Sequence, residues 1–543
     1  MQKHREIVDK VAQSVKQFYK LQQPFRIFHG STNSTRNPHT TPSVDTSSLS
    51  RVLDIDPVKK TALVEPNVPM DRLVATTLKY NLIPPVVMEF PGITVGGGFA
   101  GTSGESSSFR HGFFDKTINS VEMVLGNGDV VVASPNNEHA DLFHGAAGAV
   151  GSLVIATCIE LQLIDAQPYV ETTYHPVTSM KEAREQIAKA TQDSALEYVD
   201  GIMFSETTGA IVTGRLVEHA APGVPVQHFS RPTDPWFYMH VQEQIEKNSA
   251  RSSARSGARS DDASNGANNG ANNGANNGAN NGANNNRDAA LAAVTEIVPL
   301  EEYLFRYDRG GFWVGSSAFK YTMFPNTKLM RWFLDDFLHT RMLYRALHAS
   351  GLARQYMVQD IAVPDDTVEE FVHYTATELD IWPLWLCPLK QTPAPTLHPH
   401  DCRTAPAMEA DGVTLRPMLN VGLWGEPTRL NPYDYDAYVQ VEHALEAKLL
   451  ELGGMKWGYG KHFHPQEQFW QMFDTGWYNA LRAKYHATSL PTLYDKITVD
   501  VEVEKERRAG NWRTRALSIW PIGGMFALWK AIESKDYLLH RKK

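Results

Sequence analysis

The sequence predicts an α+β protein, in which antiparallel strands and helices occur together. Residues 51–65 and 120–133 each contain two β-rich runs around a turn, and the second turn carries Gly126 and Gly128, a strong hairpin signal. Between such runs, apolar residues recur at helical spacing. Strands joined by short turns with interspersed helices indicate α+β rather than a regular βαβ fold. The 543 residues are enough for two or three domains.

The first region runs to residue 170. A helix is expected over residues 7–19, where six apolar or aromatic residues recur at helical spacing. The other expected elements are, in order, a strand over 25–28, strands over 51–56 and 61–65, a helix over 69–79, strands over 120–125 and 128–133, and one long strand over 153–163.

The second region covers residues 171–455. A helix is expected over 181–190 and strands over 198–204 and 209–216, and most of its many aromatic residues are expected in the core. Residues 249–288 interrupt it with an Arg/Ser-rich run and Gly-Ala-Asn-Asn repeats, which offer nothing to bury and predict disorder. Residues 456–505 are expected to return to the first domain, and residues 506–543 form a C-terminal tail.

Composition excludes several classes of function. The net charge is -9 and the basic residues are scattered, so no nucleic-acid partner is expected. Cys158, Cys387 and Cys402 are far apart, which argues against disulfides and a zinc site and for a reducing compartment. The expected location is therefore intracellular, and the composition leaves open whether the chain forms an oligomer.

Membrane insertion is not expected from the sequence. No run of 18 apolar residues is present, and the N-terminus has no apolar core of signal-peptide type. Residues 516–530 are apolar but are interrupted by Pro521, and a basic tail follows them. Two alternatives stay open for this segment: shallow contact with a membrane such as that of the endoplasmic reticulum, or docking on the protein's own surface.

The most informative run is residues 91–112, which is rich in glycine and serine. Such a run brings backbone N–H groups close to an anion, which suggests a phosphorylated cofactor. It contains a Gly-x-Gly-x-x-Gly match from Gly96 to Gly101, but residues 102–108 have no apolar helical face. A dinucleotide-binding Rossmann unit requires a helix there, so that interpretation is disfavoured. A flexible surface loop is the plain alternative.

Three segments in order resemble a known flavoprotein domain. Residues 26–34 form a Gly/Ser/Thr/Asn loop after the first strand, residues 92–112 are the glycine-rich run, and residues 141–157 carry spaced glycines before the long strand. Together they resemble the FAD-binding (PCMH-type) domain of the vanillyl-alcohol oxidase and p-cresol methylhydroxylase superfamily. The resemblance implies an FAD domain of two α/β subdomains plus an α+β cap domain, with two loops around the pyrophosphate and the third segment beside the ribose and adenine.

By position in these motifs, the resemblance implies a set of cofactor contacts. The residues are His29, Gly30, Ser31, Thr32, Asn33, Ser34, Pro91, Gly92, Ile93, Thr94, Val95, Gly96, Gly97, Gly101, Thr102, Gly104, Glu105, Ser106, Ser107, Ser108, Gly112, Gly148, Gly151, Ser152, Val154 and Ile155. Members with covalent FAD carry a His after paired glycines, and here Ser31 and Thr32 stand at the comparable positions. Non-covalent FAD is therefore expected.

The C-terminal half resembles one branch, the delta(24)-sterol reductase group. The resemblance rests on residues 356–364, 381–388, 422–427, 467–474 and 493–497. It implies hydride transfer between flavin and a C=C bond of a small hydrophobic substrate, with NADPH as electron donor. The chain departs from the group in its residue 249–288 insert, its tail, and the lack of a membrane segment before the first helix. An alcohol or phenol oxidase and a non-catalytic flavoprotein scaffold remain as alternatives.

Candidate catalytic residues lie in the second half. Lys461 resembles a Gly-Lys segment that returns to the flavin ring in carbohydrate and alditol oxidases, where its charge would stabilise reduced flavin. Tyr459 is a candidate proton donor, and Glu426 and Asp360 are acids in apolar surroundings.

No metal site is expected from the sequence. His462 and His464 form a pair at strand-like spacing, but the sequence identifies no third or fourth ligand for them.

Overall fold

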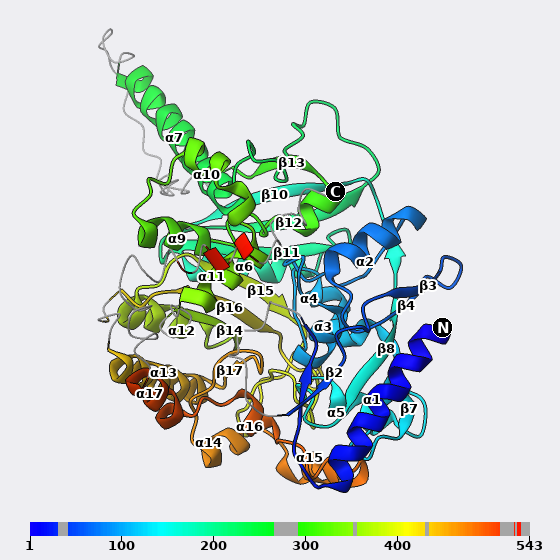
Figure 1. Cartoon of the computed structure of the whole chain (residues 1–543). Helices are drawn as coiled ribbons and strands as arrows, with labels where there is room; N and C mark the ends of the chain where they lie inside the picture. Colours follow the sequence, from blue (N-terminus) through cyan, green and yellow to red (C-terminus); the bar gives the residue numbers. More distant parts are fainter. Residues whose placement is uncertain are drawn as a thin grey trace, which may run out of the picture.

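The computed structural model of the chain describes residues 1–30, 42–264, 292–350, 356–428, 430, 434–510, 526, 529–530 and 532–533. Figure 1 shows two main sheets with helices around both. One sheet has five strands, in the order β3-β4-β8-β6-β7, and the other has eight, in the order β13-β10-β12-β11-β15-β16-β14-β17. The α+β fold class is confirmed.

The five-stranded sheet contains both predicted hairpins. Its strands are β3 (Val52–Asp56), β4 (Thr61–Val64), β6 (Ile118–Val124), β7 (Val130–Ala133) and β8 (Ile155–Gln162). Strand β8 pairs with β4 on one side and β6 on the other, so it joins the two hairpins. Its central position explains its nearly continuous apolar sequence.

Helices cover this sheet, and apolar spacing predicts two of them, α1 (Gln2–Lys20) and α2 (Met70–Thr77), but not α5 (Ala140–Ala146). Helix α1 buries Val8, Val11 and Val15. Helices α2 and α5 follow along the chain. Two small sheets complete the region: parallel β1 (Arg26–Phe28) with β2 (Ser43–Asp45), and β5 (Leu82–Ile83) with β9 (Ile164–Asp165).

The eight-stranded sheet is antiparallel throughout. Its strands are β10 (Tyr169–Val177), β11 (Tyr198–Ser205), β12 (Thr208–Val217), β13 (Val294–Pro299), β14 (Met357–Pro364), β15 (Leu384–Leu389), β16 (Met418–Gly425) and β17 (Met455–Lys456). All residues of β15 and β16 are buried, because the sheet is covered on both faces.

The two faces of this sheet have different partners. Val199 and Met203 of β11 pack in one apolar cluster with α6 (Met180–Thr191), α12 (Val368–Tyr374) and α13 (Tyr435–Leu452). Ile202 points to the opposite face and joins the core that continues into the first region. We retain the predicted domain division as a proposal, because the two sheets divide the chain at the same place.

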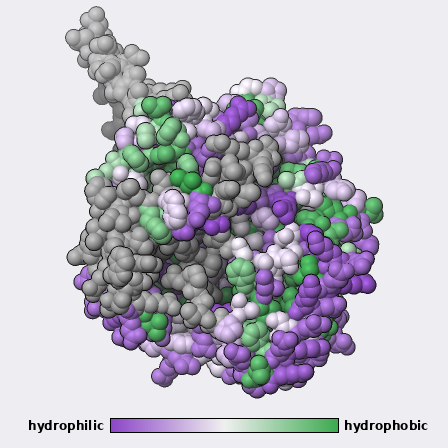
Figure 2. All heavy atoms as spheres, in the orientation of Figure 1, coloured by the Kyte–Doolittle hydropathy of each residue, from purple (hydrophilic) through white to green (hydrophobic). Residues whose placement is uncertain are grey.

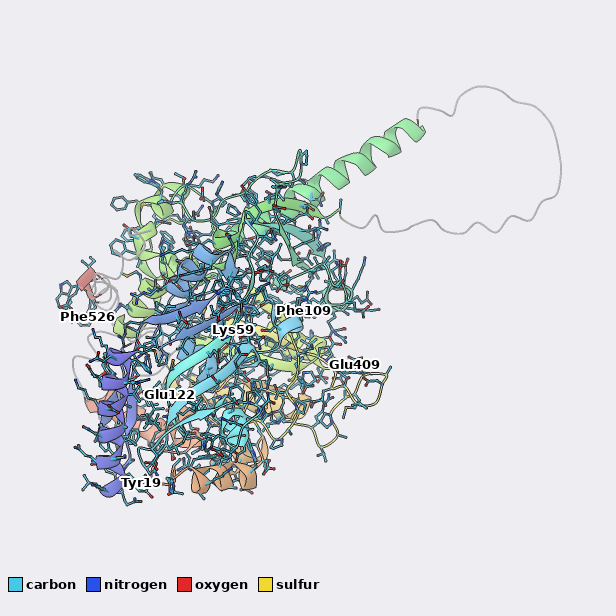
Figure 3. The ribbon with its side chains drawn as sticks, turned by 90° about the vertical axis from the view of Figure 1, so that its right-hand side faces the viewer. Tyr19, Lys59, Phe109, Glu122, Glu409 and Phe526 are labelled. Atoms are coloured by element: carbon cyan, nitrogen blue, oxygen red, sulfur yellow. The ribbon has the colours of Figure 1, made fainter. Side chains whose placement is uncertain are left out.

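Helix α7 (Phe237–Ser264) corrects part of the predicted disorder. The stretch expected to be disordered begins at residue 249, but its first part continues this helix to Ser264. Val241 and Ile245 are buried and anchor the first turns of the helix. Alanine and arginine are good helix formers, so the helix continues beyond these anchored turns. Figure 3 shows α7 projecting from the body. The rest of the predicted segment lies outside the described residues.

The remaining helices fall into two groups. Over the eight-stranded sheet, which we call the cap sheet, lie α8 (Leu300–Leu304), α9 (Val314–Thr322), α10 (Lys328–Phe333) and α11 (Thr340–Ser350). Toward the C-terminus follow α14 (Gln466–Gln471), α15 (Thr475–Lys484), α16 (Leu493–Ile497) and α17 (Val501–Gly510). Within the described part of the chain, no helix is both long and apolar enough to cross a membrane.

Candidate functional site

The glycine-rich run forms a short helix, α3 (Val95–Gly101). The Thr94 side chain caps it by accepting a hydrogen bond from the Gly97 N–H at 3.1 Å, a device that overcomes the low helix propensity of glycine. The helix ends at Thr102, whose φ is +51°. No Rossmann helix was expected over residues 102–108, and α3 ends before them after only seven residues, so the long helix of a Rossmann unit is absent from this run.

The glycines of α3 allow close packing. A Cβ atom at Gly96 would lie 2.6 Å from Pro66 Cβ, and one at Gly98 would lie 2.5 Å from Met88 Cε. The Gly96 N–H already donates to the Pro66 carbonyl at 2.7 Å. Gly96 therefore serves packing, and its expected phosphate contact through this N–H has no support in the structure.

The rest of the run joins the two regions of the protein. Ser107 donates its hydroxyl to the Pro85 carbonyl at 2.8 Å, and the Val199 N–H of β11 donates to the Ser106 carbonyl at 2.8 Å. Helix α4 (Ser108–His111) then ends at Gly112, whose φ is +78°. Residues 105–108 thus hold the run against the cap sheet, and their contact with a cofactor stays a prediction.

The first and third predicted motifs meet a C-terminal helix. A Cβ atom at Gly151 would lie 2.7 Å from Ile27 Cδ1, and the Lys496 ammonium of α16 donates to the Gly151 carbonyl at 2.9 Å. Arg26 donates through Nη2 to the Asp495 carbonyl at 3.1 Å, while its Nε is buried without a hydrogen-bond partner. Two cations and an unsatisfied donor fit an anionic pyrophosphate. Residues 31–34 of the first loop lie outside the described residues, and His29 and Gly30 are exposed at its start.

Gly148, in the third motif, tests how closely this motif packs against Leu397. It adopts φ +80°, and a Cβ atom would lie 2.8 Å from the Leu397 carbonyl oxygen. We expect Gly148→Ala to lower the free energy of unfolding by about 1–3 kcal/mol, because strain and overlap with backbone add together. Gly223→Ala is the matched control: its φ is +79° and nothing lies within 4 Å. Urea denaturation of both variants measures the difference, and equal losses would contradict the close packing.

A C-terminal strand and loop bring Tyr459 to the glycine-rich run. The Trp457 indole N–H donates to the Thr102 carbonyl at 3.0 Å, and the Trp457 backbone N–H donates to the Asp360 carbonyl at 3.1 Å. A Cβ atom at Gly101 would lie 3.3 Å from Tyr459 Cδ1. Residues from the run, from β14 and from the C-terminal segment therefore converge at one point.

Tyr459 and Asp360 form a hydrogen-bonded pair at this point. The Tyr459 hydroxyl donates to Asp360 Oδ2 at 2.9 Å, and Asn420 Nδ2 lies 3.4 Å from Asp360 Oδ1. Desolvation raises the pKa of Asp360 to about 6, and desolvation followed by the Asp360 charge raises the pKa of Tyr459 well above its usual range. Both side chains are half-buried. The Asp360 carboxyl group therefore has a pKa closer to neutrality than usual, and both side chains are partly open to a ligand.

The surroundings of this pair fit a polar ring. Gln359 Oε1 and Asn420 Oδ1 are buried acceptors without a hydrogen-bond partner. Buried polar atoms are normally paired, so a ligand that carries N–H donors fits here. The flavin ring of FAD is such a ligand. Among the chain's own residues, Gln359 and Asn420 would hold its polar edge.

The other predicted catalytic residues lie elsewhere. Lys461 is half-buried, and its backbone carbonyl accepts a hydrogen bond from Gln359 Nε2 at 3.1 Å. Gln359 directly precedes Asp360 in β14. Glu426 is exposed just beyond β16, and the structure does not bring it to Tyr459. The carboxyl group at this position is that of Asp360. The roles of Lys461 and Glu426 stay predictions.

A second buried cluster was missed by the sequence analysis. Arg306 is 2% exposed and donates through Nη2 to Glu89 Oε1 and Asp200 Oδ2, both at 2.9 Å. Asp200 also accepts from the Tyr307 hydroxyl at 2.6 Å and from Trp385 Nε1 at 3.0 Å. Two sequence features could have indicated this cluster. Glu89 is a charged residue inside an apolar run, and Arg306 is a cation inside an aromatic run.

This cluster holds more carboxyl groups than cations. Desolvation raises the pKa of Glu89 to about 8, opposed by Arg306. Desolvation, then the charges of Glu89 and Asp360, raise the pKa of Glu105 well above its usual range. Burial thus favours the protonated form of both glutamates, which relieves the excess negative charge.

The raised pKa of Glu89 predicts a pH effect on stability. A carboxyl group whose pKa rises from 4.5 to about 8 on folding stabilises the protein fully below pH 4.5 and loses this contribution as pH rises through 8. We expect Glu89→Gln to flatten the fall in unfolding midpoint between pH 6 and 9. Desolvation lowers the pKa of His339, but the charges of Asp308 and Asp335 outweigh it and raise the pKa to about 9. His339 therefore adds a pH dependence of stability in the same direction, and it is unchanged in the variant. Identical slopes for both proteins would contradict the assignment.

The two histidines acquire a third neighbour in the structure. Candidate ligand atoms of Glu446, His462 and His464 all lie within 4.8 Å of one another. The Lys456 ammonium already bonds Glu446 at 2.8 Å and Glu442 at 2.7 Å, so a cation occupies this carboxylate pair. The expected absence of a metal stays a prediction.

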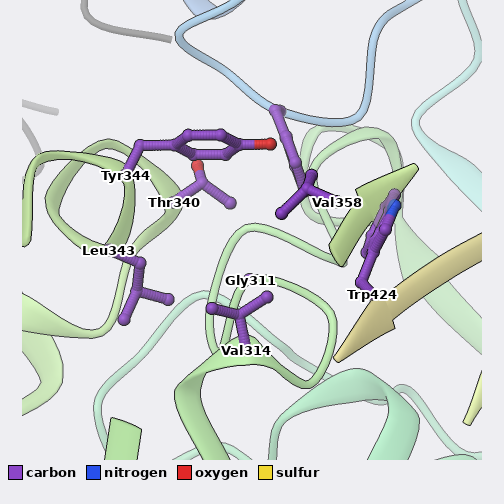
Figure 4. A pocket seen from close by; sticks show the side chains of 8 residues that line it. Gly311, Val314, Thr340, Leu343, Tyr344, Val358 and Trp424 are labelled. Carbon is purple, nitrogen blue, oxygen red and sulfur yellow. The ribbon is translucent and has the colours of Figure 1, made fainter. Parts of the chain in front are cut away.

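An apolar cavity lies beside the Tyr459–Asp360 pair. It measures about 20 Å³, and Figure 4 shows its lining: Phe90, Gly311, Val314, Thr340, Leu343, Tyr344, Val358 and Trp424. Desolvation and then the Asp360 charge raise the pKa of Tyr344, which places the cavity next to the pair. The space has room for about one water molecule.

Comparisons with known proteins agree with this geometry. A profile of the FAD binding domain family matches residues 6–134. The chain is 25% identical to the delta(24)-sterol reductase of Homo sapiens over 454 residues, 83% of this chain and 76% of that protein. It is 25% identical to that of Pisum sativum over 491 residues, 86% and 78% of the two chains. It is also 32% identical to cytokinin dehydrogenase 9 of Oryza sativa subsp. japonica over 138 residues, 25% and 26% of the two chains.

The cytokinin dehydrogenase match covers 25% of the chain, whereas the human sterol reductase match covers 83% of it and therefore extends over both regions. The glycine-rich run, the Arg26 and Lys496 cations and the unsatisfied acceptors at Gln359 and Asn420 agree with FAD as the cofactor. The chain is therefore an FAD-dependent oxidoreductase, which is similar to the FAD binding domain family over residues 6–134 and to the delta(24)-sterol reductases over most of its length.

Proposed function

We propose that the protein reduces an isolated C=C bond of an apolar substrate, as the name of its sterol reductase relatives suggests. The observation that carries this proposal is the half-buried Tyr459–Asp360 pair, which lies near an apolar cavity lined by Tyr344 and Val358. Reduction of an olefin requires a hydride at one carbon and a proton at the other. FAD, when bound, supplies the hydride chemistry.

The proton comes from this chain's own residues. Below its pKa, Asp360 carries a proton that it donates to the Tyr459 oxygen, while the Tyr459 O–H proton passes to the substrate carbon. Tyr459 is then neutral again and Asp360 is left ionised, so no phenolate forms beside a carboxylate. Asn420 holds the other oxygen of Asp360 and keeps the carboxyl group oriented.

This relay predicts a pH profile. The rate of olefin reduction should fall as pH rises through about 6, because Asp360 loses the proton that it donates. In Asp360→Asn, the remaining activity should show no inflection near pH 6. The measurement is single-turnover oxidation of reduced enzyme by olefin from pH 5 to 8. An unchanged inflection in the variant would assign the titration to another group.

The cavity supports an apolar substrate. Its lining is aromatic and aliphatic, and Phe90 packs edge-on against Phe312 with 5.4 Å between ring centroids. A sterol with a side-chain double bond is the proposed substrate. The cavity holds about one water molecule, so binding requires the side chains of α9 and α11 to move apart.

NADPH is the proposed electron donor. Apart from the glycine-rich run, the described residues form no second nucleotide-binding fold. NADPH would therefore reach the flavin through the same cavity as the olefin, and it would leave before the olefin enters. This order predicts ping-pong kinetics.

The test is anaerobic and spectroscopic. Purified protein loaded with FAD should lose its flavin absorbance on titration with NADPH and regain it when a sterol with a side-chain double bond is added. No bleaching by NADPH, together with peroxide formation from an alcohol or phenol panel in air, would instead support an oxidase. A flavin that neither donor class reduces would indicate a non-catalytic scaffold.

A further inference from the structure

The surface of α9 and α10 exposes large apolar side chains. Five of them form what we call the apolar ridge: Met323, Phe324, Leu329, Trp332 and Phe333, with exposed fractions of 67%, 49%, 69%, 52% and 70%. Figure 2 shows apolar surface gathered over α10. Scattered exposed apolar residues are ordinary, but five within eleven positions form a patch of the kind that contacts another apolar phase.

The ridge sits in a cationic segment. Residues 314–334 contain Lys320, Lys328 and Arg331 and no acidic residue, although the whole chain carries a net charge of -9. Asp335, the next acid, is buried and bonds Arg309 at 2.7 Å. Lys320 and Lys328 are exposed beside the ridge, and Asp336 is half-buried. Aromatic residues flanked by lysines are typical of elements that lie in the interface of an anionic bilayer.

The fold holds the ridge outward. Thr327 caps α10 by accepting from the Met330 N–H at 3.3 Å, and Met330 packs on the core. Arg331 bonds Asn326 Oδ1 at 2.7 Å and lies 5.5 Å from the centre of the Trp236 ring. These contacts hold one side of α10 against the protein, so Trp332 and Phe333 lie on the side that faces solvent. Such a preset arrangement lowers the entropy cost of docking.

The same helices reach the cavity. Val314 begins α9 and lines the cavity, together with Thr340 and Leu343 of α11. The ridge lies at the other end of α9 and on α10. We propose that the apolar ridge docks the protein on an anionic lipid bilayer. A lipid-soluble substrate would then pass along α9 into the cavity; this second step rests on the proposed function, whereas docking does not.

Vesicle flotation of the full-length holoenzyme tests docking. We expect binding to vesicles of phosphatidylcholine with 30% phosphatidylserine and weaker binding to phosphatidylcholine alone. Trp332→Ser/Phe333→Ser should lower binding at least tenfold. Lys320→Gln/Lys328→Gln should lower binding to the anionic vesicles by about fivefold for each lysine.

Matched controls separate the ridge from general hydrophobicity. Val58→Ser and Val413→Ser remove apolar residues that are 90% and 81% exposed elsewhere, and they should leave binding unchanged. Trp529→Ser tests the C-terminal segment, and it too should leave binding unchanged. The proposal is overturned if the ridge variant binds like wild type, if wild type binds neither vesicle, or if the ridge variant instead dissolves a dimer seen by light scattering.

Docking and catalysis fail separately in these assays. Flotation measures no turnover, so a negative result leaves the proposed reductase intact. With wild-type docking established, the ridge variant should reduce a detergent-dispersed olefin at the wild-type rate and a vesicle-embedded sterol more slowly. Equal rates on both substrates would overturn the delivery step alone.

Discussion

Replacing Tyr459 with phenylalanine will slow reduction of the olefin by about 10²–10⁴-fold, the range of a lost general acid. The change removes the hydroxyl that bonds Asp360 at 2.9 Å and keeps the ring that lies against Gly101. Flavin content should therefore stay at the wild-type level. Stopped-flow measurement of the two half-reactions separates the steps.

The half-reaction with NADPH is the internal control for this variant. It requires no proton for a carbon atom, so its rate should change less than threefold. If Tyr459→Phe slows both half-reactions equally, the hydroxyl positions the flavin and does not donate the proton. If it slows neither, the proton comes from another group and the proposed relay is wrong.

Replacing Arg306 with methionine will lower the free energy of unfolding by about 3–5 kcal/mol at pH 7. The variant leaves the buried carboxyl of Asp200 without its ion pair, and it removes the neighbour that keeps Glu89 in place. Methionine fills much of the same volume, so the loss reports on charge more than on packing. Urea denaturation followed by tryptophan fluorescence measures it.

A compensating variant tests the electrostatic origin of this loss. Arg306→Met/Asp200→Asn should regain part of the stability, because the amide oxygen still accepts from Tyr307 and Trp385 and carries no charge. If the double variant is less stable than Arg306→Met alone, the loss has a packing origin.

Local patterns predicted local structure well. The hairpins β3/β4 and β6/β7 depend on turns and on apolar runs that are adjacent in sequence, and both form. Helix α1 is evident from its apolar spacing. Helix α3 was missed because its cap at Thr94 and its contacts with Pro66 and Met88 outweigh four glycines, which is an override of propensity by tertiary contacts.

The site was predicted less well because its partners are distant in sequence. Tyr459 was identified, but its partner Asp360 lies 99 positions earlier, and no local pattern favoured Asp360 over Glu426. The bonds of Arg306 to Asp200 and Glu89 span 106 and 217 positions. Only the sheet order brings these residues together, and the sequence does not show that order.

The contact between Trp457 and Thr102 has a consequence for biosynthesis. The two residues are 355 positions apart, so the N-terminal region leaves the ribosome long before its C-terminal partners exist. At about 5–20 residues per second, roughly 20–70 s separate the two events. During that interval the nascent first region lacks Trp457, Tyr459 and Lys496, which contact Thr102, Gly101 and Gly151 in the complete fold. We therefore expect the polypeptide to bind its cofactor only near the end of synthesis, and an incomplete chain not to retain FAD.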